Sequence, residues 1–470
     1  MKLSINDIDT FFEKVALHKA SDTSVYFIGI GGIGMSAIAR YFLSKGVKVS
    51  GYDKTETPLT RRLTEEGMNI HYEDSIDLID KSADLVVYTP AVPKDHREYN
   101  YLIENDFLIL KRSEVLGMIT KNSFNICVAG THGKTTTSSM IAHILTSSGY
   151  GCNAFLGGVT VNYDTNFLSS SNNVCVVEAD EYDRSFLKLS PDIAVITSMD
   201  PDHLDIYGSK ESFTDAFVDF SSKVKKGGFL FSKKNLERSA DLLCPNKITY
   251  DIQDEHSNVF VRNLTTENGS YHFDVDVNGY LMKGFILNMG GLHNVENVMV
   301  SIAVAKFLEI EEDKIRTAVS SFRGVKRRFE YIIKSDDLVM IDDYAHHPQE
   351  LEALLNGTKN LFPNKSCLII FQPHLYSRTR DFAEDFSKAL NIADEIWLLP
   401  IYPAREAPIA GVTSEIIQMN MPTNKVKCYS KEEAVQLLKE KSDYDILITA
   451  GAGDIDTLVS PIKKMLTKTI

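Results

Sequence analysis

Two glycine-rich stretches in this chain carry the residue types that bind phosphate groups. The first places Gly29, Gly31, Gly32 and Gly34 in the pattern G-x-G-x-x-G, and the second reads G-T-H-G-K-T-T from 130 to 136. Each follows an apolar run and precedes an amphipathic one. In a strand–loop–helix unit of this kind, backbone N–H groups and the helix dipole point toward an anion. Two such loops predict two phosphate-bearing ligands.

The first loop has the spacing of a dinucleotide-binding fingerprint. Asp53 follows nineteen residues after Gly34, at the end of the next apolar run, where an acidic side chain meets a ribose hydroxyl. The loop recognises a pyrophosphate, which both a nicotinamide dinucleotide and a UDP-sugar contain. Read alone, the pattern therefore leaves an NAD-dependent oxidoreductase and a UDP-sugar-binding protein open, beside a tight turn without a ligand.

The second loop is shorter than the usual G-x-x-x-x-G-K-[ST] pattern, because only two residues separate its glycines. Lys134 is placed to reach β- and γ-phosphates, and the Thr135 hydroxyl to bind Mg²⁺. Two acidic clusters follow the next apolar runs, one containing Glu178 and one containing His203. Since hard oxygen ligands suit Mg²⁺ better than a structural zinc, these clusters predict a divalent metal used with a nucleotide. The residues expected to bind the nucleotide here are Gly130, Thr131, His132, Gly133, Lys134, Thr135 and Thr136.

The elements that must position these loops are short apolar runs alternating with amphipathic stretches, which indicates parallel sheets covered by helices. Residues 247–287 differ, because apolar and polar residues alternate around Asn278-Gly279, a strong hairpin signal. A third alternating region starts near residue 322. We therefore predict an α/β protein with three domains, 1–115, 116–321 and 322–470. The central one contains the second glycine loop and is expected to have a parallel sheet plus a small β-sheet.

Composition bounds the function. The 470 residues are 43% hydrophobic and 24% charged, with a net charge of −14. A large core is available, and the acidic balance argues against nucleic acid as a partner. No stretch approaches the roughly 18 consecutive apolar residues that a membrane span needs. Six separated cysteines without a C-x-x-C pattern, several of them in apolar runs, indicate buried free thiols in the cytoplasm.

The two loops, the Glu178 and His203 clusters, "HNVEN" (293–297), "RRFE" (327–330) and "DDYAHHP" (342–348) occur in one order. Together they resemble the Mur ligase family over nearly the whole chain, whose nucleotide loop is the short form G-T-x-G-K-[ST]. The resemblance implies a Rossmann-like first domain for a UDP-sugar, a central phosphate-loop ATPase domain, and a Rossmann-like third domain that closes over both. It also implies an ATP-dependent ligase that joins L-alanine to UDP-N-acetylmuramate in peptidoglycan precursor synthesis, through an acyl phosphate.

The resemblance further implies roles for single residues. Thr135, Glu178 and His203 would bind two Mg²⁺ ions, for which Mn²⁺ is a possible substitute. Residues for ATP, in addition to its loop, would be His293, Asn294, Asn297, Arg328 and Asp343. Residues for the amino acid would be Tyr344, His346, Arg378 and Arg380, with Lys134, His346 and Arg378 catalytic. Leu375 departs from the family, in which many members carry arginine, so Arg380 is considered as a substitute.

Several alternatives remain open at this point. A sister ligase that attaches an intact tripeptide to the same UDP-sugar would share both loops and the metal site. An NAD-dependent oxidoreductase built on the first loop would leave Lys134, Glu178 and His203 without a role, and a non-catalytic nucleotide-binding switch is the third alternative. Either His346 or His203 would accept the proton of the attacking amine. We expect a monomer or weak dimer.

Overall fold

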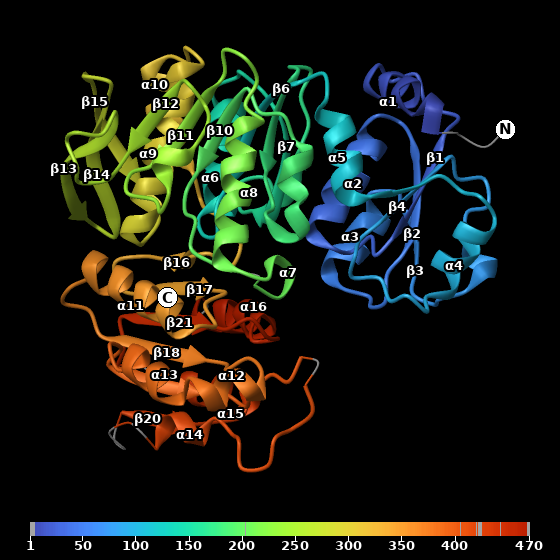
Figure 1. Cartoon of the computed structure of the whole chain (residues 1–470). Helices are drawn as coiled ribbons and strands as arrows, with labels where there is room; N and C mark the ends of the chain where they lie inside the picture. The colour runs from blue at the N-terminus through green and yellow to red at the C-terminus, as the bar shows by residue number, and fades with distance from the viewer. Residues whose placement is uncertain are drawn as a thin grey trace.

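The computed structural model describes residues 5–202, 204–404, 406–419, 421, 425–441 and 443–467. Three α/β domains follow one another along the chain, and each contains its own β-sheet. In Figure 1 the first lies to the right of the central one, and the third lies below the central one. The expected three-domain α/β fold is confirmed, whereas the domain limits near residues 115 and 322 remain predictions.

The first sheet has five parallel strands in the order β3-β2-β1-β4-β5. This is a doubly wound order, in which ligands bind beyond the carboxyl ends of the strands where the order reverses, here between β1 and β4. The strands are β1 (Ser24–Ile28), β2 (Lys48–Tyr52), β3 (Asn69–His71), β4 (Leu85–Tyr88) and β5 (Ile109–Lys111). The helices are α1 (Ile8–Ala16), α2 (Ile33–Ser44), α3 (Pro58–Glu65), α4 (Arg97–Glu104) and α5 (Arg112–Thr120).

The central sheet has ten strands in the order β15-β14-β13-β12-β11-β10-β6-β9-β7-β8. Its parallel part runs from β12 to β7, and the antiparallel β13–β15 joins it through one residue pair, Tyr250 with Val259. The expected small sheet is therefore β13–β15, which extends the large sheet at one edge. The expected hairpin at Asn278-Gly279 is confirmed, since it connects β14 to β15 and both residues have positive φ.

The central strands are β6 (Phe124–Ala129), β7 (Asn153–Thr160), β8 (Thr165–Leu168), β9 (Val174–Glu178), β10 (Ile193–Ile196), β11 (Phe229–Lys233), β12 (Lys247–Tyr250), β13 (Val259–Glu267), β14 (Ser270–Val277) and β15 (Tyr280–Leu287). The helices are α6 (Lys134–Ser147), α7 (Leu204–Tyr207), α8 (Lys210–Ser222), α9 (Leu292–Phe307) and α10 (Glu312–Ser321). The longest of these, α9, is buried along most of its length and packs on α6. The apolar contact between α6 and α9 fixes the helix that begins at the phosphate loop.

The third sheet has the order β16-β17-β21-β18-β19-β20 and is parallel except for β16. Its strands are β16 (Glu330–Lys334), β17 (Val339–Asp343), β18 (Cys367–Phe371), β19 (Glu395–Leu398), β20 (Val426–Cys428) and β21 (Ile446–Ala450). Its helices are α11 (Pro348–Leu361), α12 (Tyr376–Asp381), α13 (Ala383–Leu390), α14 (Glu415–Gln418), α15 (Lys431–Leu438) and α16 (Asp456–Leu466).

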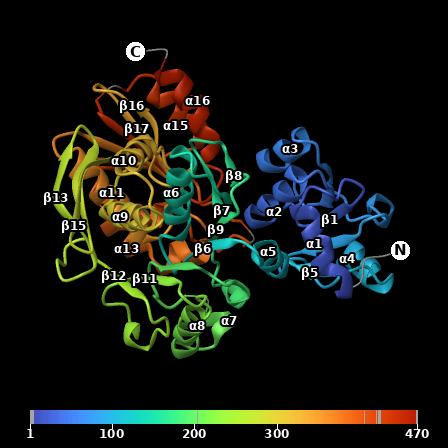
Figure 2. The same cartoon turned by 90° about the horizontal axis from the view of Figure 1, so that it is seen from above.

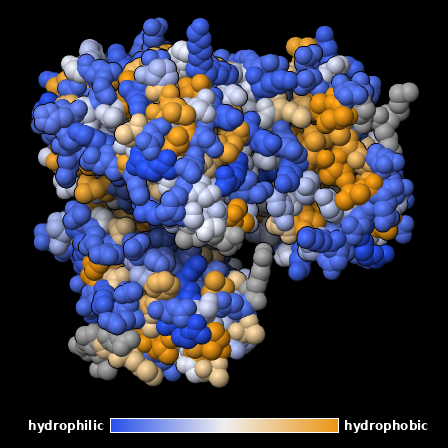
Figure 3. Space-filling model, in the orientation of Figure 1, coloured by the Kyte–Doolittle hydropathy of each residue, from blue (hydrophilic) through white to orange (hydrophobic). Residues whose placement is uncertain are grey.

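The three layers are packed together rather than strung on linkers. One hydrophobic cluster contains residues of both the central and the third sheets, and another joins the first domain to the central one. Seen from above, α2 of the first domain faces β7 and β8 of the central domain (Figure 2). In the view of Figure 3 the largest hydrophobic area lies over the first domain. Within the described part of the chain, every helix is too short or too polar to cross a bilayer.

Candidate active site

The second glycine loop connects β6 to α6. Gly130 and Gly133 have φ of +138° and +82°, values that side chains with a Cβ rarely adopt. Space also requires glycine at position 130, because a Cβ there would stand 2.2 Å from Thr197 Oγ1. Neighbouring β10 supports the loop, since the His132 N–H donates to Ser198 Oγ at 2.7 Å. The loop is therefore complete and tightly held despite its short spacing.

Lys134 lies at the start of α6 and is paired inside the chain. Its ammonium group is 2.7 Å from Glu181 Oε1 and donates to the Gly130 carbonyl at 2.6 Å. The Glu181 side chain is only 2% exposed, and burial raises the pKa of this carboxyl. The second carboxylate oxygen, Oε2, is buried without a hydrogen-bond partner. Lys134 therefore compensates a buried carboxylate at the position where nucleotide phosphates would lie.

Thr135 and Glu178 are in direct contact at the carboxyl edge of the central sheet. The Thr135 hydroxyl donates to Glu178 Oε1 at 3.0 Å, and the Gly157 N–H donates to Oε2 at 2.9 Å. Burial raises the pKa of Glu178, and nearby Lys134 opposes this rise. A hydroxyl and a carboxylate that lacks a full counter-charge suit a hard divalent cation such as Mg²⁺.

The second expected metal ligand from the acidic clusters, His203, lies outside the described residues. Among the residues that are described, no group of three or more His, Cys, Asp or Glu side chains is arranged to hold a metal. The protein ligands that the described chain offers are thus Thr135 and Glu178, and phosphate oxygens would have to complete the coordination.

The first glycine loop connects β1 to α2 and is organised by Asp53. Asp53 Oδ2 accepts the Gly31 N–H at 2.7 Å, and Gly29 has a φ of +85°. A Cβ on Gly31 would stand 2.8 Å from the same carboxylate oxygen. The carboxylate expected to meet a ribose thus also shapes the loop itself.

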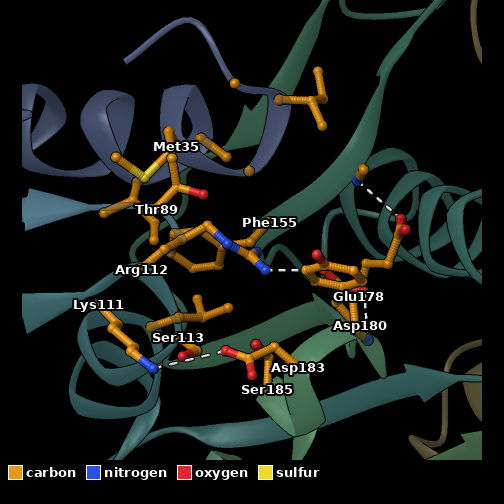
Figure 4. Close-up of a pocket in the computed structure, with 18 of the residues that line it drawn as sticks. Met35, Thr89, Lys111, Arg112, Ser113, Phe155, Glu178, Asp180, Asp183 and Ser185 are labelled. Carbon is orange, nitrogen blue, oxygen red and sulfur yellow. Dashed lines mark hydrogen bonds and ion pairs between the residues drawn. The ribbon is translucent and has the colours of Figure 1, made fainter. Parts of the chain in front are cut away.

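A cavity of about 490 Å³ runs from this loop to Glu178 (Figure 4). Its first-domain wall comes from the start of α2, the residues after β4 and the start of α5, and its central-domain wall from β7, β9 and the turn after β9. Arg112 points across it and pairs with Asp180 at 2.9 Å, and Lys111 approaches Asp183 at 3.7 Å. The lining includes Gly32, Gly34, Met35, Thr89, Lys111, Arg112, Ser113, Phe155, Gly157, Glu178, Asp180, Asp183 and Ser185.

The start of α9 lies against the phosphate loop. A Cβ on Gly133 would stand 2.9 Å from Asn297 Oδ1, so this amide oxygen lies directly beside the loop. Asn294 is buried and uses its amide within the chain, donating to Gly290 O at 2.6 Å and accepting from Asn297 at 3.2 Å. The pKa of His293 is lowered by desolvation and by the nearby cations Arg328 and Lys233. His293 and Asn297 are therefore better placed than Asn294 to contact a nucleotide.

Three of the expected residues come from the start of the third domain. Asp343 ends β17 and accepts the N–H groups of Phe329 and Ala345 at 2.6 and 2.7 Å, and burial raises its pKa to about 6. Tyr344 is exposed, and the Arg328 guanidinium lies 5.9 Å from the centre of its ring. Asp343 thus holds the turn that presents Arg328 toward the central domain.

The other residues expected to bind the amino-acid substrate differ in how their side chains are paired. His346 Nδ1 donates a 2.9 Å hydrogen bond to the Tyr344 carbonyl, and burial lowers the pKa of His346. Arg378 has a buried Nη1 atom without a partner, as does Nδ1 of neighbouring His374. Arg380 instead is exposed and pairs with Asp381 at 2.7 Å. Orphaned donors indicate an anion site at Arg378, and nothing comparable is found at Arg380.

The sequence interpretation did not include Arg112 and Lys111 as site residues. Both end or directly follow β5, at the same carboxyl edge as the first glycine loop. A Cβ on Gly34 would stand 2.8 Å from Arg112 Nη1, which places this cation beside the loop. The basic pair after an apolar run was the available signal. Gly157 was not predictable, because its role depends on a backbone N–H rather than on a side chain.

Two Rossmann-like domains lie on either side of a phosphate-loop domain, and a cavity extends from the first glycine loop to Glu178, which is bonded to Thr135 of the second. This arrangement defines a nucleotide-dependent enzyme of the multidomain α/β class. Family models match almost all of it: "Mur ligase family, catalytic domain" at residues 24–124, "Mur ligase middle domain" at 128–305, and "Mur ligase, glutamate ligase domain" at 327–453. The chain belongs to the Mur ligase family.

Individual relatives cover nearly its full length. It is 48% identical to the UDP-N-acetylmuramate–L-alanine ligase of Cytophaga hutchinsonii over 94% of this chain and 96% of that one. It is also 48% identical to the enzyme of the same name from Flavobacterium johnsoniae, over 95% and 98%. The crystal structure of UDP-N-acetylmuramate-alanine ligase from Thermotoga maritima matches with a TM-score of 0.81 and 28% identity, over 95% of this chain and 100% of that one.

Proposed function

We propose that this protein is an ATP-dependent ligase that joins L-alanine to the lactyl carboxylate of UDP-N-acetylmuramate in peptidoglycan precursor synthesis. The observation that carries the proposal is the cavity that extends from the first glycine loop to Glu178, which is hydrogen bonded to Thr135 of the phosphate loop. A UDP-sugar bound at the first loop would thereby present its far end to ATP bound at the second. The full-length relatives named above carry this activity in their names.

The chemistry requires activation of a poor electrophile. Nucleophilic attack on a carboxylate would add charge to an anion, so the carboxylate oxygen first attacks the γ-phosphorus of ATP, and ADP leaves. The amine of L-alanine then attacks the acyl phosphate carbon, and the tetrahedral species collapses to the amide with loss of inorganic phosphate. Phosphoryl transfer of this type depends on positioning and charge neutralisation.

The residues of this chain supply that positioning. Lys134 would exchange its bond with Glu181 for the nucleotide phosphates, and Arg112 lies where the pyrophosphate of the UDP-sugar would pass. Thr135 and Glu178 would hold Mg²⁺, which neutralises charge on the transferred phosphoryl group. We propose two such ions, with His203 as a ligand of the second and Mn²⁺ as a substitute.

The amino acid would enter from the third domain. Arg378 has the free donor needed for its carboxylate, and Tyr344 and His346 lie at the same surface of the domain. Burial lowers the pKa of His346 and so favours the neutral imidazole, which acceptance of the ammonium proton requires. His203 is the other candidate base. ATP is the expected nucleotide, with contacts from His293, Asn297, Arg328 and Asp343.

We further propose that both substrates are small molecules, without nucleic-acid or membrane partners, and that the protein acts in the cytoplasm as a monomer or weak dimer. The net charge of −14 supports the exclusion of nucleic acid.

The decisive experiment measures phosphate release with ATP and Mg²⁺ while UDP-N-acetylmuramate and each amino acid are added in turn. Release that requires both the UDP-sugar and L-alanine, with amide product detected by mass spectrometry, is the expected result. Turnover with L-Ala-γ-D-Glu-meso-diaminopimelate but not with L-alanine would establish the tripeptide-adding alternative. Phosphate release independent of the UDP-sugar would contradict the ligase function, and nicotinamide binding in a fluorescence titration would support an oxidoreductase.

A further inference from the structure

A polar bridge centred on one fully buried side chain connects the first glycine loop to the central domain. Asn166 on β8 is 0% exposed, and its Nδ2 donates to the Ile33 carbonyl at 2.6 Å and to Ser36 Oγ at 3.0 Å. Ile33 is the first residue of α2, directly after Gly32. Asn166 Oδ1 accepts a hydrogen bond from Arg40 on the same helix. One side chain of the central domain therefore holds α2 both at its first turn and two turns further along.

The bridge continues into the first domain without an unpaired group. Arg40 is 6% exposed and donates from Nε and Nη2 to the two oxygens of Glu66, each at 2.8 Å. Fully satisfied buried polar networks rigidify the elements that they connect. Aromatic rings lie beside the bridge. The ring centre of Tyr41, on α2, is 5.8 Å from that of Phe155 and 6.2 Å from that of Phe167. Apolar packing and oriented hydrogen bonds thus fix the same contact.

The central-domain side of this contact is also the support of the candidate metal carboxylate. Asn166 precedes Phe167, which is paired with Phe155 across the β7–β8 hairpin. Two residues after Phe155, Gly157 donates its N–H to Glu178. The hairpin therefore has the first glycine loop bonded to one strand and Glu178 bonded to the other. Phe155 also pairs with Val177, the residue before Glu178, so paired residues of β8, β7 and β9 connect the two sites, while Gly157 lies in the irregular stretch of β7 between Phe155 and Thr160.

From this geometry we infer that Asn166 is a positioning residue for ligation: it fixes the first glycine loop relative to Glu178, so that the bound UDP-sugar delivers its carboxylate to the γ-phosphate. The inference rests on the proposed function. A shift of about 1 Å in reacting atoms can cost on the order of 100-fold in rate. Loss of the Asn166 bridge should thus reduce kcat by about 10- to 100-fold while leaving nucleotide binding unchanged, because the phosphate loop lies outside the bridge.

The test compares Asn166→Ala and Asn166→Asp with the control Asn125→Ala. Asn125 is 1% exposed and donates two side-chain hydrogen bonds, to Thr120 O and Ser190 O, but it lies at the opposite end of β6 from the phosphate loop. Asn166→Asp keeps an oxygen that can accept from Arg40 but removes the amide group that donates to Ile33 and Ser36. If the alanine variant fails to fold, the aspartate variant alone tests the inference. For each variant kcat, the Kd of UDP-N-acetylmuramate and the Kd of a non-hydrolysable ATP analogue are measured below the melting temperature.

The expected result is a loss of kcat in both Asn166 variants that exceeds any change in the two Kd values, with near-normal kcat in Asn125→Ala. Unchanged kcat in the Asn166 variants would overturn the inference, as would an equal loss in the control or a loss explained by weaker UDP-sugar binding. A wild-type protein that fails to use L-alanine would instead refute the proposed function, so the two failures are distinguishable.

Discussion

The pairing of Lys134 with Glu181 allows the catalytic role of the lysine to be separated from its structural role. Lys134→Ala removes the cation expected to hold the β- and γ-phosphates, and it also leaves Glu181 buried at 2% exposure without its 2.7 Å partner. Breaking a buried ion pair from one side costs about 3–5 kcal/mol of stability. Loss of one preorganised contact to developing charge costs about 2.7–4 kcal/mol of barrier, or roughly 100- to 1,000-fold in kcat.

The stability loss should depend on pH in a defined direction. Burial raises the pKa of Glu181, which favours its protonated form, and removal of Lys134 should raise this pKa further. A carboxyl whose pKa is higher in the folded than in the unfolded state stabilises the fold at low pH and loses that contribution as pH rises. The deficit of Lys134→Ala relative to wild type should therefore be smaller at pH 5 than at pH 8.

The double variant Lys134→Ala/Glu181→Gln isolates the catalytic effect, because it removes the unpaired charge as well. We expect urea denaturation to show that it regains most of the lost stability, while the phosphate-release assay still shows a loss of at least about 100-fold. Lys225→Ala serves as the matched control, since Lys225 also pairs with a carboxylate of the central domain, Asp192 at 2.7 Å, but lies at the other edge of the sheet. Near-normal ligation by Lys134→Ala, or recovery of activity in the double variant, would refute the assignment.

Three further predictions follow from the third domain. His346→Gln should lower kcat/KM for L-alanine by about 100-fold or more. Because burial lowers the pKa of His346, the wild-type enzyme should lose activity only at pH values below the ordinary histidine pKa. Steady-state kinetics from pH 5 to 9 test both points. Arg378→Lys should raise KM for L-alanine while leaving the Kd of UDP-N-acetylmuramate unchanged, since lysine keeps the charge but not the forked geometry; isothermal calorimetry would contradict this if both ligands weakened equally. Burial raises the pKa of Asp342 to about 7, so ionisation of this group lowers the free energy of unfolding as pH rises from about 4 to 7, by at most about 1.4 kcal/mol per pH unit. Asp342→Asn should remove that decline, so the stability of the variant relative to wild type should be greater at pH 8 than at pH 5. A difference in the free energy of unfolding that does not change with pH would contradict this prediction.

Local patterns determined how much of this structure was predictable. The glycine loops, the Asn278-Gly279 hairpin and the alternation of strands and helices depend on residues close in sequence, and the structure has all of them. The side chains of Asp53 and Asn294 fit ligand-binding motifs, yet much of their hydrogen-bonding capacity is used inside the chain. That use depends on loop conformation, which a motif does not specify.

The contacts that bring the ligand sites together were not predictable, because they join segments far apart in sequence. Arg112 contacts Gly34 of the first glycine loop, 78 residues earlier in the chain, and Asp180, 68 residues later. Asn166 lies in a polar stretch without a motif, and its burial appears only when α2 packs on β8. The sequence therefore predicted the residues that would contact ligands better than the long-range contacts that hold those residues in place.

That framework centres on the β7–β8 hairpin, which contacts all three domains. Its strands hold α2 through Asn166 and Glu178 through Gly157. Its far end receives the linker to the third domain, since Val161 donates to Gly324 O at 3.0 Å and the Lys326 N–H donates to Val159 O at 2.9 Å. Asp164, in the turn, pairs with both Arg62 of the first domain and Lys326 of that linker. Because a single hairpin contacts the first glycine loop, the carboxylate of Glu178 and the linker, it gives the third domain a direct mechanical connection to both sites, beside the contacts that Tyr331 and Lys334 make with Gly269.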